Sequence, residues 1–322
     1  MRSSATIVLG CGLLLGGHAT LACPLFASGF EAGELPPAAD DLCPLSDEFD
    51  DSATLADWSR LYEVEGWPDQ LENWDIAIGQ AGHMTLLPYT SSWYEDLRGV
   101  LVFKPVTGDF VVSTRFTAGN RAQTGAPQAL FSLAGLFIRA PRDIQSPDDW
   151  TPGGENYVFL SAGSADSPGN YQYEVKTTID SESTLHITSA CETTCDPLRT
   201  FELRAARLEG DHMIMLRREP GSTWQVHRRY PRNDLPENLQ VGVTSYTDWG
   251  SIIGVYWPDD QFGHNNTVIT DGNPDLLARF EYVRFRRPAI PAGLQGRNFS
   301  APFDPGDPTT VSDAELLSFL GF

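Results

Sequence analysis

Four short segments of the chain place an aromatic residue beside an acidic one. They are Trp93-Tyr94-Glu95-Asp96, Asp149-Trp150, Tyr246-Thr247-Asp248-Trp249 and Tyr256-Trp257-Pro258-Asp259-Asp260. A sugar ring has apolar faces and hydroxyl edges, so a site that holds one needs exposed aromatic rings next to hydrogen-bonding groups. The chain has 8 Trp and 10 Tyr. A single ring of this kind is more often core or rim packing, but the concentration of these motifs indicates carbohydrate recognition.

Groups suited to catalysis are harder to find. Glu174 is the acid closest to the middle of an expected strand, but Lys176 follows two positions later and points to the same face, so an ordinary ion pair is the simpler interpretation. The chain has no Gly-x-Ser-x-Gly motif, and its 6 histidines are never spaced as metal ligands. These observations favour a non-catalytic protein over an enzyme that uses Glu174 with a second acid.

Acidic residues near both ends of the expected β-domain are candidates for calcium binding. Asp47, Asp50 and Asp51 lie near its start, and Asp271 and Asp275 precede its last strand. Calcium prefers carboxylate and carbonyl oxygens, and a loose site suffices outside the cell. Asp47, Asp50 and Asp275 are therefore the candidate ligands of a structural calcium ion, with unliganded surface acids as the alternative.

The N-terminus predicts export from a bacterial cell. Residues 1–22 have the layout of a signal peptide, with Arg2, an apolar run over 5–15 and small residues at the exit. We expect the protein to be secreted or periplasmic, with no membrane span after cleavage, because no later apolar segment reaches about 18 residues. The segment before Cys23 also resembles a lipoprotein box, so a lipid anchor at Cys23 is the alternative.

The number of cysteines helps to decide between plain secretion and a lipid anchor. Cleavage after Ala22 leaves Cys23, Cys43, Cys191 and Cys195, and the local pairing joins Cys23 to Cys43 and Cys191 to Cys195. Lipidation of Cys23 would leave Cys43 unpaired in an oxidising compartment. The count therefore favours plain secretion with two disulfides, although four cysteines allow three pairings.

The charge of the chain excludes one class of partner. Lys and Arg total 22 against 43 Asp and Glu, a formal net charge of −21 that is spread along the chain. Binding to a phosphate backbone needs a basic patch, so a nucleic acid is not an expected partner.

Short runs of β-branched, aromatic and aliphatic residues recur over 46–287, separated by Gly, Pro, Asn, Asp and Ser. This spacing is typical of an antiparallel sandwich. Phe201, Leu203 and Ala205 alternate with polar neighbours, and 280–286 alternates with one slip. The fourteen expected strands, which suit a large jelly roll, are 74–79, 83–87, 100–106, 109–117, 132–139, 156–161, 171–178, 184–189, 200–207, 212–218, 223–229, 239–246, 252–257 and 278–286.

The two flanks of this domain differ in composition. Residues 23–45 lack a periodic pattern and predict an irregular lead, and 288–310 are rich in Pro and Gly, which indicates a linker. In 311–322, Ser312 and Glu315 form a capping-box pattern ahead of an apolar run, which predicts a short helix. The helix is expected to cap the sandwich, with a docking tail for another protein as the alternative.

Several segments of the chain carry a family resemblance. They are Asp47-Glu48-Phe49-Asp50 with Leu55-Ala56-Asp57-Trp58, Ala134-Gly135-Leu136-Phe137-Ile138-Arg139, Trp150, Asn156-Tyr157-Val158 and Gln240-Val241-Gly242-Val243. In this order they resemble the concanavalin A-like lectin/glucanase superfamily, including its DUF1349-type and laminin-G-like bacterial sandwiches. The resemblance implies an all-β, two-sheet antiparallel sandwich that binds or hydrolyses glycans. The glucanase branch carries its carboxylates as E-x-D-x-x-E on one strand, a pattern that this chain lacks.

The period of two along each strand predicts where a glycan would bind. If Leu136 and Ile138 face the core, Arg139 faces outward, and the same reasoning turns Tyr246 outward. We expect a solvent-exposed sheet face on which aromatic rings stack on sugar and charged groups hold hydroxyls. The predicted site residues are Arg139, Trp150, Tyr157, Glu174, Tyr246, Asp248 and Trp249. A structural or protein-interaction sandwich without a glycan ligand is the alternative.

Overall fold

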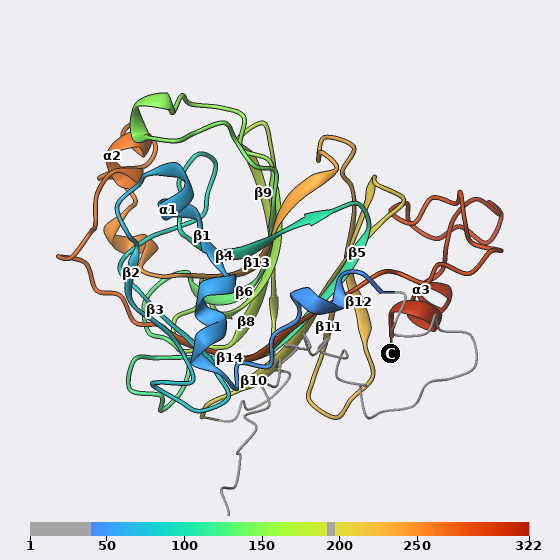
Figure 1. Cartoon of the computed structure of the whole chain (residues 1–322), viewed down its shortest axis with the longest axis horizontal. Helices are drawn as coiled ribbons and strands as arrows, with labels where there is room; N and C mark the ends of the chain where they lie inside the picture. Colours follow the sequence, from blue (N-terminus) through green and yellow to red (C-terminus); the bar gives the residue numbers. More distant parts are fainter. Residues whose placement is uncertain (1–39, 192–196, 322) are drawn as a thin grey trace, which may run out of the picture.

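Two antiparallel sheets of seven strands each build the protein, with three short helices (Figure 1). The computed structural model describes residues 40–191 and 197–321. The predicted signal peptide at 1–22 lies outside the described residues, as do Cys23 and Cys195, so both predicted disulfides remain predictions. The all-β sandwich with a short C-terminal helix is confirmed.

The first sheet has the order β1-β4-β13-β6-β7-β8-β9. Its strands are β1 Ser59–Arg60, β4 Val100–Thr107, β13 Asn238–Tyr246, β6 Ser132–Arg139, β7 Tyr157–Ser164, β8 Gln172–Ile179 and β9 Glu182–Ser189. The second sheet has the order β12-β11-β10-β5-β14-β3-β2. Its strands are β12 Gln225–Pro231, β11 His212–Arg218, β10 Thr200–Leu208, β5 Phe110–Gly119, β14 Leu277–Arg286, β3 Met84–Pro88 and β2 Leu71–Ile76.

The inner faces of the two sheets pack on each other and form the main core. On β10, Phe201, Leu203 and Ala205 point into it, as their alternation with polar residues predicts. The rings of Phe116 and Phe280 stack across neighbouring strands with centroids 5.1 Å apart. The slip in the pattern of 280–286 corresponds to a β-bulge, because the pairing of β14 with β5 shifts register between Phe280 and Tyr282.

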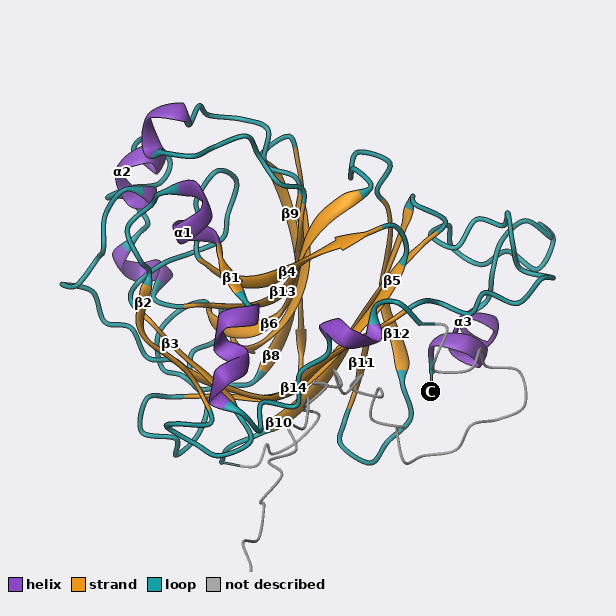
Figure 2. Cartoon of the chain, viewed as in Figure 1, coloured by secondary structure: helices purple, strands orange, loops and turns teal. Residues whose placement is uncertain are grey.

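The C-terminal segment covers part of the outer face of the second sheet, over β5, β10, β11 and β12 (Figure 2). Helix α3, Asp313–Leu320, begins at Ser312, whose side chain forms the predicted capping box with Glu315. Its apolar residues pack with side chains of β5, β10 and β11, and the segment predicted as a linker contributes two more buried side chains. The members of this cluster include Val111, Leu208, Ile214, Leu216, Trp224, Leu294, Phe299, Leu316, Phe319 and Leu320.

The outer face of the first sheet is covered by connections between strands (Figure 2). We call these the covering loops: residues 89–99, 140–156 and 247–276, together with helix α1, Leu61–Glu65. They include the turns η4, Pro147–Asp149, and η5, Trp249–Ser251, and helix α2, Gln261–Asn265. Trp93 from this layer packs against Phe137 on β6, with ring centroids 4.4 Å apart. Two further 3-10 turns, η2 Cys43–Leu45 and η3 Ser52–Asp57, lie near the start of the described chain.

One predicted strand is wrong. Residues 252–257 form consecutive turns, with an isolated bridge between Ile253 and Trp257 in place of a strand. The turns follow from Asp248, which adopts a left-handed backbone with φ 69°, and they bury Ile252 against Leu97 and Ile269. Among the helices of the described residues, none combines the length and apolar composition needed to cross a membrane.

Candidate functional site

The outer face of the first sheet brings together four of the predicted site residues. Arg139 on β6 pairs with Tyr157 on β7, and the side chains of Glu174 on β8 and Tyr246 on β13 are hydrogen-bonded to each other. The prediction that all four face away from the main core is confirmed. The expected exposure to solvent is wrong, because the covering loops leave each of these side chains 0% exposed.

A network of charged residues fills one part of this covered face. Glu65 on α1 and Glu155 in the loop before β7 are each held by both Arg98 and Arg139, and we call these four residues the charge network. Arg139 Nη1 lies 2.8 Å from Glu65 Oε1, and its Nε lies 2.8 Å from Glu155 Oε2. Arg98 also donates to both carboxylates from the loop above the sheet. Glu65 is therefore paired with two arginines, and Glu155 with three, because Arg142 also contacts it. Buried charges need such partners.

The electrostatics of Glu155 oppose a role in proton transfer. Burial alone would raise the pKa of this carboxyl group, but the positive charges of Arg139 and Arg98 hold the pKa well below its ordinary range. A general acid in glycoside hydrolysis needs a raised pKa so that it carries a proton to donate. Glu155 is instead a permanent anion whose oxygens accept hydrogen bonds from arginine.

Glu174 is the centre of a second buried group. Tyr246 donates its hydroxyl proton to Glu174 Oε2 at 2.8 Å, and Lys176 Nζ lies 3.0 Å from Glu174 Oε1. The predicted pairing of Glu174 with Lys176 is confirmed. Lys176 also donates to the backbone carbonyl of Trp93, which ties the covering loop 89–99 to the sheet. Burial and the nearby Glu174 charge raise the pKa of Tyr246 well above its usual value, so the hydroxyl stays a proton donor.

The aromatic–acid motifs of the sequence meet above this group, in the covering loops. Tyr94, Trp249 and Trp257, which we call the aromatic rim, pack edge-on or tilted with ring centroids 5.6 to 5.7 Å apart. All three side chains are half-buried. Glu95 Oε2 accepts from Trp257 Nε1 at 2.9 Å and from Gln261 Nε2 at 3.2 Å. The rim thus combines half-buried aromatic rings with a carboxylate held in place beside them.

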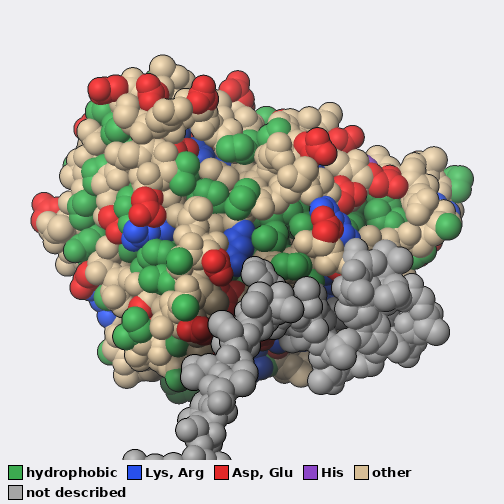
Figure 3. Space-filling model, viewed as in Figure 1, with side chains coloured by type: hydrophobic (Ala, Val, Ile, Leu, Met, Phe, Trp, Pro, Cys, Tyr) green, Lys and Arg blue, Asp and Glu red, His purple; other side chains and the backbone are tan. Residues whose placement is uncertain are grey.

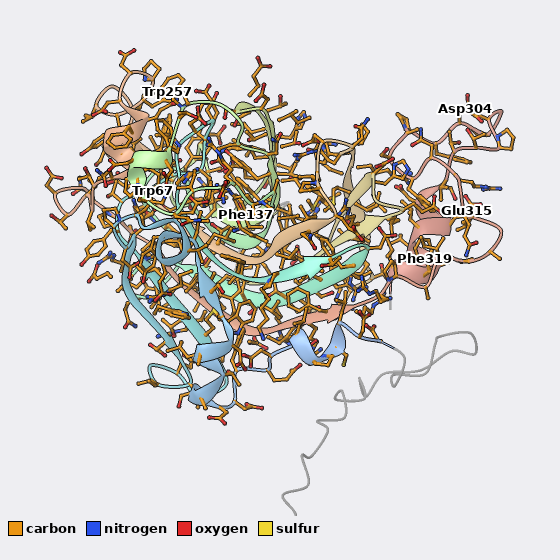
Figure 4. The ribbon with its side chains drawn as sticks, turned by 45° about the horizontal axis from the view of Figure 1, so that its top comes forward. Trp67, Phe137, Trp257, Asp304, Glu315 and Phe319 are labelled. Atoms are coloured by element: carbon orange, nitrogen blue, oxygen red, sulfur yellow. The ribbon has the colours of Figure 1, made fainter. Side chains whose placement is uncertain are left out.

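Trp150 belongs to a neighbouring aromatic group. Its ring packs against Trp67 and Phe262, with centroids 6.4 Å and 5.8 Å away. Trp67 is buried over Arg98 of the charge network, while Phe262 is 40% exposed. Figure 4 shows Trp257 in the covering loops, Trp67 in the segment that follows α1, and Phe137 on the sheet. Trp150 therefore packs on the rings of Trp67 and Phe262, and its role in a glycan site stays a prediction.

Asp248 has a structural position. Its carboxylate is buried and accepts from Thr90 Oγ1 at 2.8 Å and from the backbone amide of Asn273 at 2.6 Å. Through Asn273 it links the start of loop 247–276 to the end of the same loop, and through Thr90 it links this loop to loop 89–99. Its hydrogen bonds hold the turn from which Trp249 projects.

The candidate calcium ligands do not form a cluster. Asp47 is buried, accepts from Trp58 Nε1 at 3.0 Å and bridges to Val283 within β14, whereas Asp275 precedes β14 and accepts from the amides of Arg121 and Gln128. Eight residues of extended chain separate Val283 from Asp275, roughly 25 Å. Within residues 40–191 and 197–321, no three His, Cys, Asp or Glu side chains are grouped as metal ligands. Asp50 is exposed, and calcium binding remains a prediction.

Sequence patterns alone did not reveal the partners of Arg139. Glu65, Arg98 and Glu155 lie outside the strands in α1 and two covering loops. Glu65 and Arg139 are 74 positions apart. The available signal was indirect: an arginine on a strand otherwise apolar throughout needs a buried carboxylate.

Solved structures that resemble the chain include a functionally unknown protein from Saccharomyces cerevisiae, which is 14% identical over 73% of this chain and 98% of that chain, with a TM-score of 0.48. Basic winged bean lectin, solved with Tn-antigen, is 12% identical over 71% of this chain and 96% of the lectin chain, with a TM-score of 0.38. A pseudo β-1,3-glucanase of Mycobacterium tuberculosis is 12% identical over 75% of this chain and 97% of that protein's chain, with a TM-score of 0.40. These likenesses are too distant to bear on what the chain binds. Comparison with protein-family models and with curated protein sequences gives no match.

Proposed function

We propose that the protein is an exported, lectin-like sandwich that binds a neutral glycan at the aromatic rim. The observation that carries the proposal is the position of Glu95, whose carboxylate is held by Trp257 and Gln261 beside the half-buried rings of Tyr94 and Trp249. Ring faces that reach solvent accept the apolar side of a sugar, and a fixed carboxylate accepts hydrogen bonds from its hydroxyl groups.

The surroundings of the rim also suit such a ligand. Ile253 and Val255 in the same loop are 48% and 65% exposed, so the apolar surface extends beyond the rings. Glu95 has a left-handed backbone with φ 54°, a strained conformation that a functional site often retains. These features place apolar and polar groups side by side at the molecular surface.

Charge narrows the class of glycan. Residues 247–276 contain aspartates but no lysine or arginine, and Arg98 and Arg142 in the other covering loops are paired with Glu155. Figure 3 shows acidic side chains along the edge of the molecule on which α2 lies. A uronate or sulfate group would be repelled there, whereas a neutral sugar would not.

The proposal is tested by retention on a glycan array of neutral and acidic polysaccharides. We expect retention of the wild type on one or more neutral glycans, and Trp257→Ala and Glu95→Gln should each weaken it at least tenfold. Removing the ring takes away a stacking face, and the amide of Gln removes the charged acceptor.

Trp74→Ala is the matched control, because Trp74 on β2 is also half-buried but lies on the other sheet. Its retention should equal that of the wild type at a temperature well below unfolding. If no glycan retains the wild type, or if Trp74→Ala weakens retention as much as Trp257→Ala, the rim is not a glycan site.

Export is the second part of the proposal. The layout of residues 1–22 supports a signal peptide cleaved before Cys23. Mass spectrometry of the protein from its native host should find a mature N-terminus at Cys23 without a lipid. A diacylglyceryl-modified Cys23 would instead establish the lipoprotein alternative.

A further inference from the structure

Two of the edge strands, β9 and β12, carry no buried side chain. Strand β9 is the edge of the first sheet, next to β8, and β12 is the edge of the second sheet, next to β11. Side chains on β9 and β12 are exposed or half-buried along their whole length, unlike those on the central strands. We call this side of the sandwich, between β9 and β12, the open edge (Figure 1).

Inner-facing side chains of both sheets meet at the open edge. The guanidinium of Arg217 on β11 lies 4.5 Å from the centre of the Tyr173 ring on β8. The ring of His227 on β12 lies 5.9 Å from the same tyrosine. Burial, together with the positive charges of Arg217, Arg228 and His186, lowers the pKa of His227 to about 4. Four basic side chains therefore share one region.

The two arginines at the open edge differ from their immediate neighbours in sequence. Arg218 on β11 and Arg229 on β12 face the other side of the sheet and are paired with Glu202 and Asp313. Among the described residues no ion pair joins Arg217 or Arg228 to a carboxylate, although the chain carries a net charge of −21, and Arg217 is hydrogen-bonded to the Tyr173 hydroxyl instead. Two unneutralised arginines in so acidic a protein are a site for an anion.

The carboxylates at the two ends of this region are already engaged. Glu219 pairs with Arg199 and accepts from the Tyr173 hydroxyl at 3.3 Å, and Asp234 pairs with the buried Arg232. Neither neutralises Arg217 or Arg228. The positive charge in the middle of the open edge is thus left for a ligand.

Polar atoms without partners lie in the same place. The buried His227 Nε2, Tyr230 hydroxyl and Thr188 Oγ1 have no hydrogen-bond partner within the described part of the chain. Tyr230 packs against the main core, and Thr188 lies opposite Tyr173 in the pairing of β8 with β9. A buried polar group left without a partner costs about 1–3 kcal/mol. Hydroxyl groups of a ligand would satisfy all three once the flexible arginine side chains turn toward it.

We propose that the open edge binds a carboxylate-bearing sugar, with Arg217 and Arg228 holding the carboxylate and Tyr230, His227 and Thr188 receiving its hydroxyl groups. A guanidinium binds a carboxylate through two parallel hydrogen bonds, which fixes its orientation. This site is separate from the aromatic rim and does not rest on the function proposed there. Its ligand must carry a negative charge, whereas the ligand proposed for the rim is neutral.

The test is calorimetric titration of the full exported chain with a galacturonic acid trimer at pH 7 and low salt. The fully methyl-esterified trimer is the neutral analogue of the same length. We expect saturable binding of the acid and at least tenfold weaker binding of the ester. The double variant Arg217→Gln, Arg228→Gln should weaken binding of the acid at least tenfold.

The matched control is Arg218→Gln with Arg229→Gln, which removes the same charge from the same two strands on their opposite face. It should bind the acid within about threefold of the wild type, and thermal melts identify any variant that does not fold. A charge-conserving variant, Arg217→Lys with Arg228→Lys, should bind between the wild type and the glutamine variant, because lysine keeps the charge but not the bidentate geometry.

A second readout is the His227 ring followed by NMR through a pH titration. A bound carboxylate beside it should raise its pKa in the wild type when the acid trimer is added. Absence of saturable binding, equal binding of the ester, or equal weakening by both double glutamine variants would each overturn the proposal. Trp257→Ala should leave binding of the acid unchanged, so failure here is distinct from failure at the rim.

Discussion

Part of the outer face of each sheet is covered, but in chemically opposite ways. The covering loops bury the first sheet partly through the charge network of Glu65, Arg98, Arg139 and Glu155. The C-terminal segment buries the second sheet through apolar contacts around α3. Truncating an apolar side chain lowers stability in proportion to the buried apolar area that is lost. Removing one partner of a buried ion network costs more, because it leaves an unpaired buried charge. We therefore expect the two covers to respond differently to single substitutions.

An arginine also contributes to the apolar cover. Arg204 on β10 lies 4.2 Å from the centre of the Trp224 ring and donates to Ser113 and to the carbonyl of Leu320 at the end of α3. Burial, with the nearby charge of Arg286, lowers the pKa of Arg204 well below its usual value. A cation at the C-terminal end of α3 complements the helix dipole.

The largest expected effect comes from breaking the charge network. Glu155→Ala leaves Arg98 and Arg139 with one carboxylate between them in a buried site, and should lower the free energy of unfolding by about 3–5 kcal/mol. Denaturant unfolding measures the loss. Glu63→Ala is the control, because the exposed Glu63 pairs with Arg60 at the surface and should cost less than about 1 kcal/mol. A loss below 1 kcal/mol for Glu155→Ala would remove the distinction between the two covers.

A smaller effect is expected when the apolar cover is trimmed. Leu316 of α3 is completely buried, and Leu316→Ala should lower the free energy of unfolding by about 2–3 kcal/mol through lost contacts and a cavity. Ala314→Ser on the exposed side of α3 should change it by less than about 0.5 kcal/mol. If Leu316→Ala leaves stability unchanged, α3 is not an integral part of the fold.

Acid should also destabilise the loop cover. Burial lowers the pKa of His264 in α2 to about 4, so the folded protein keeps this ring neutral while the unfolded chain protonates it near pH 6.5. Stability is therefore unaffected above pH 6.5 and is lost as the pH falls from 6.5 toward 4, by at most about 3 kcal/mol. His264→Gln should remove this part of the pH dependence in unfolding experiments, and His186→Gln, at an exposed position, should not. A pH profile unchanged by His264→Gln would contradict the assignment.

The smallest effect on stability is expected at the surface of the loop cover. Val255 is 65% exposed, and Val255→Ser should change the free energy of unfolding by less than about 0.5 kcal/mol. Ile252, three positions earlier, is completely buried, and Ile252→Ala should cost about 2–4 kcal/mol. Melting curves of both variants show where the folded layer ends and the surface available to a ligand begins. A large loss for Val255→Ser would place that residue inside the packed layer.

Local patterns predicted most of the strands and the direction of their side chains, although the strand expected over 252–257 is wrong and β1 was not predicted. The alternation of Phe201, Leu203 and Ala205 placed them in the core, and the slip in 280–286 corresponds to a β-bulge. The capping-box pattern of Ser312 and Glu315 predicted helix α3. These features depend on residues close in sequence, and for that reason the sequence alone carries them.

The accessibility of a strand's outer face is not a local property. The period of two turned Arg139, Glu174 and Tyr246 away from the core, but only the tertiary structure decided that covering loops bury them and that Tyr94, Trp249 and Trp257 reach the surface instead. Contacts such as that between Glu65 and Arg139 join residues 74 positions apart. Strand periodicity fixes a side chain's direction within one sheet, whereas its burial depends on which distant segments fold over it, because desolvation is set by everything that packs around a group.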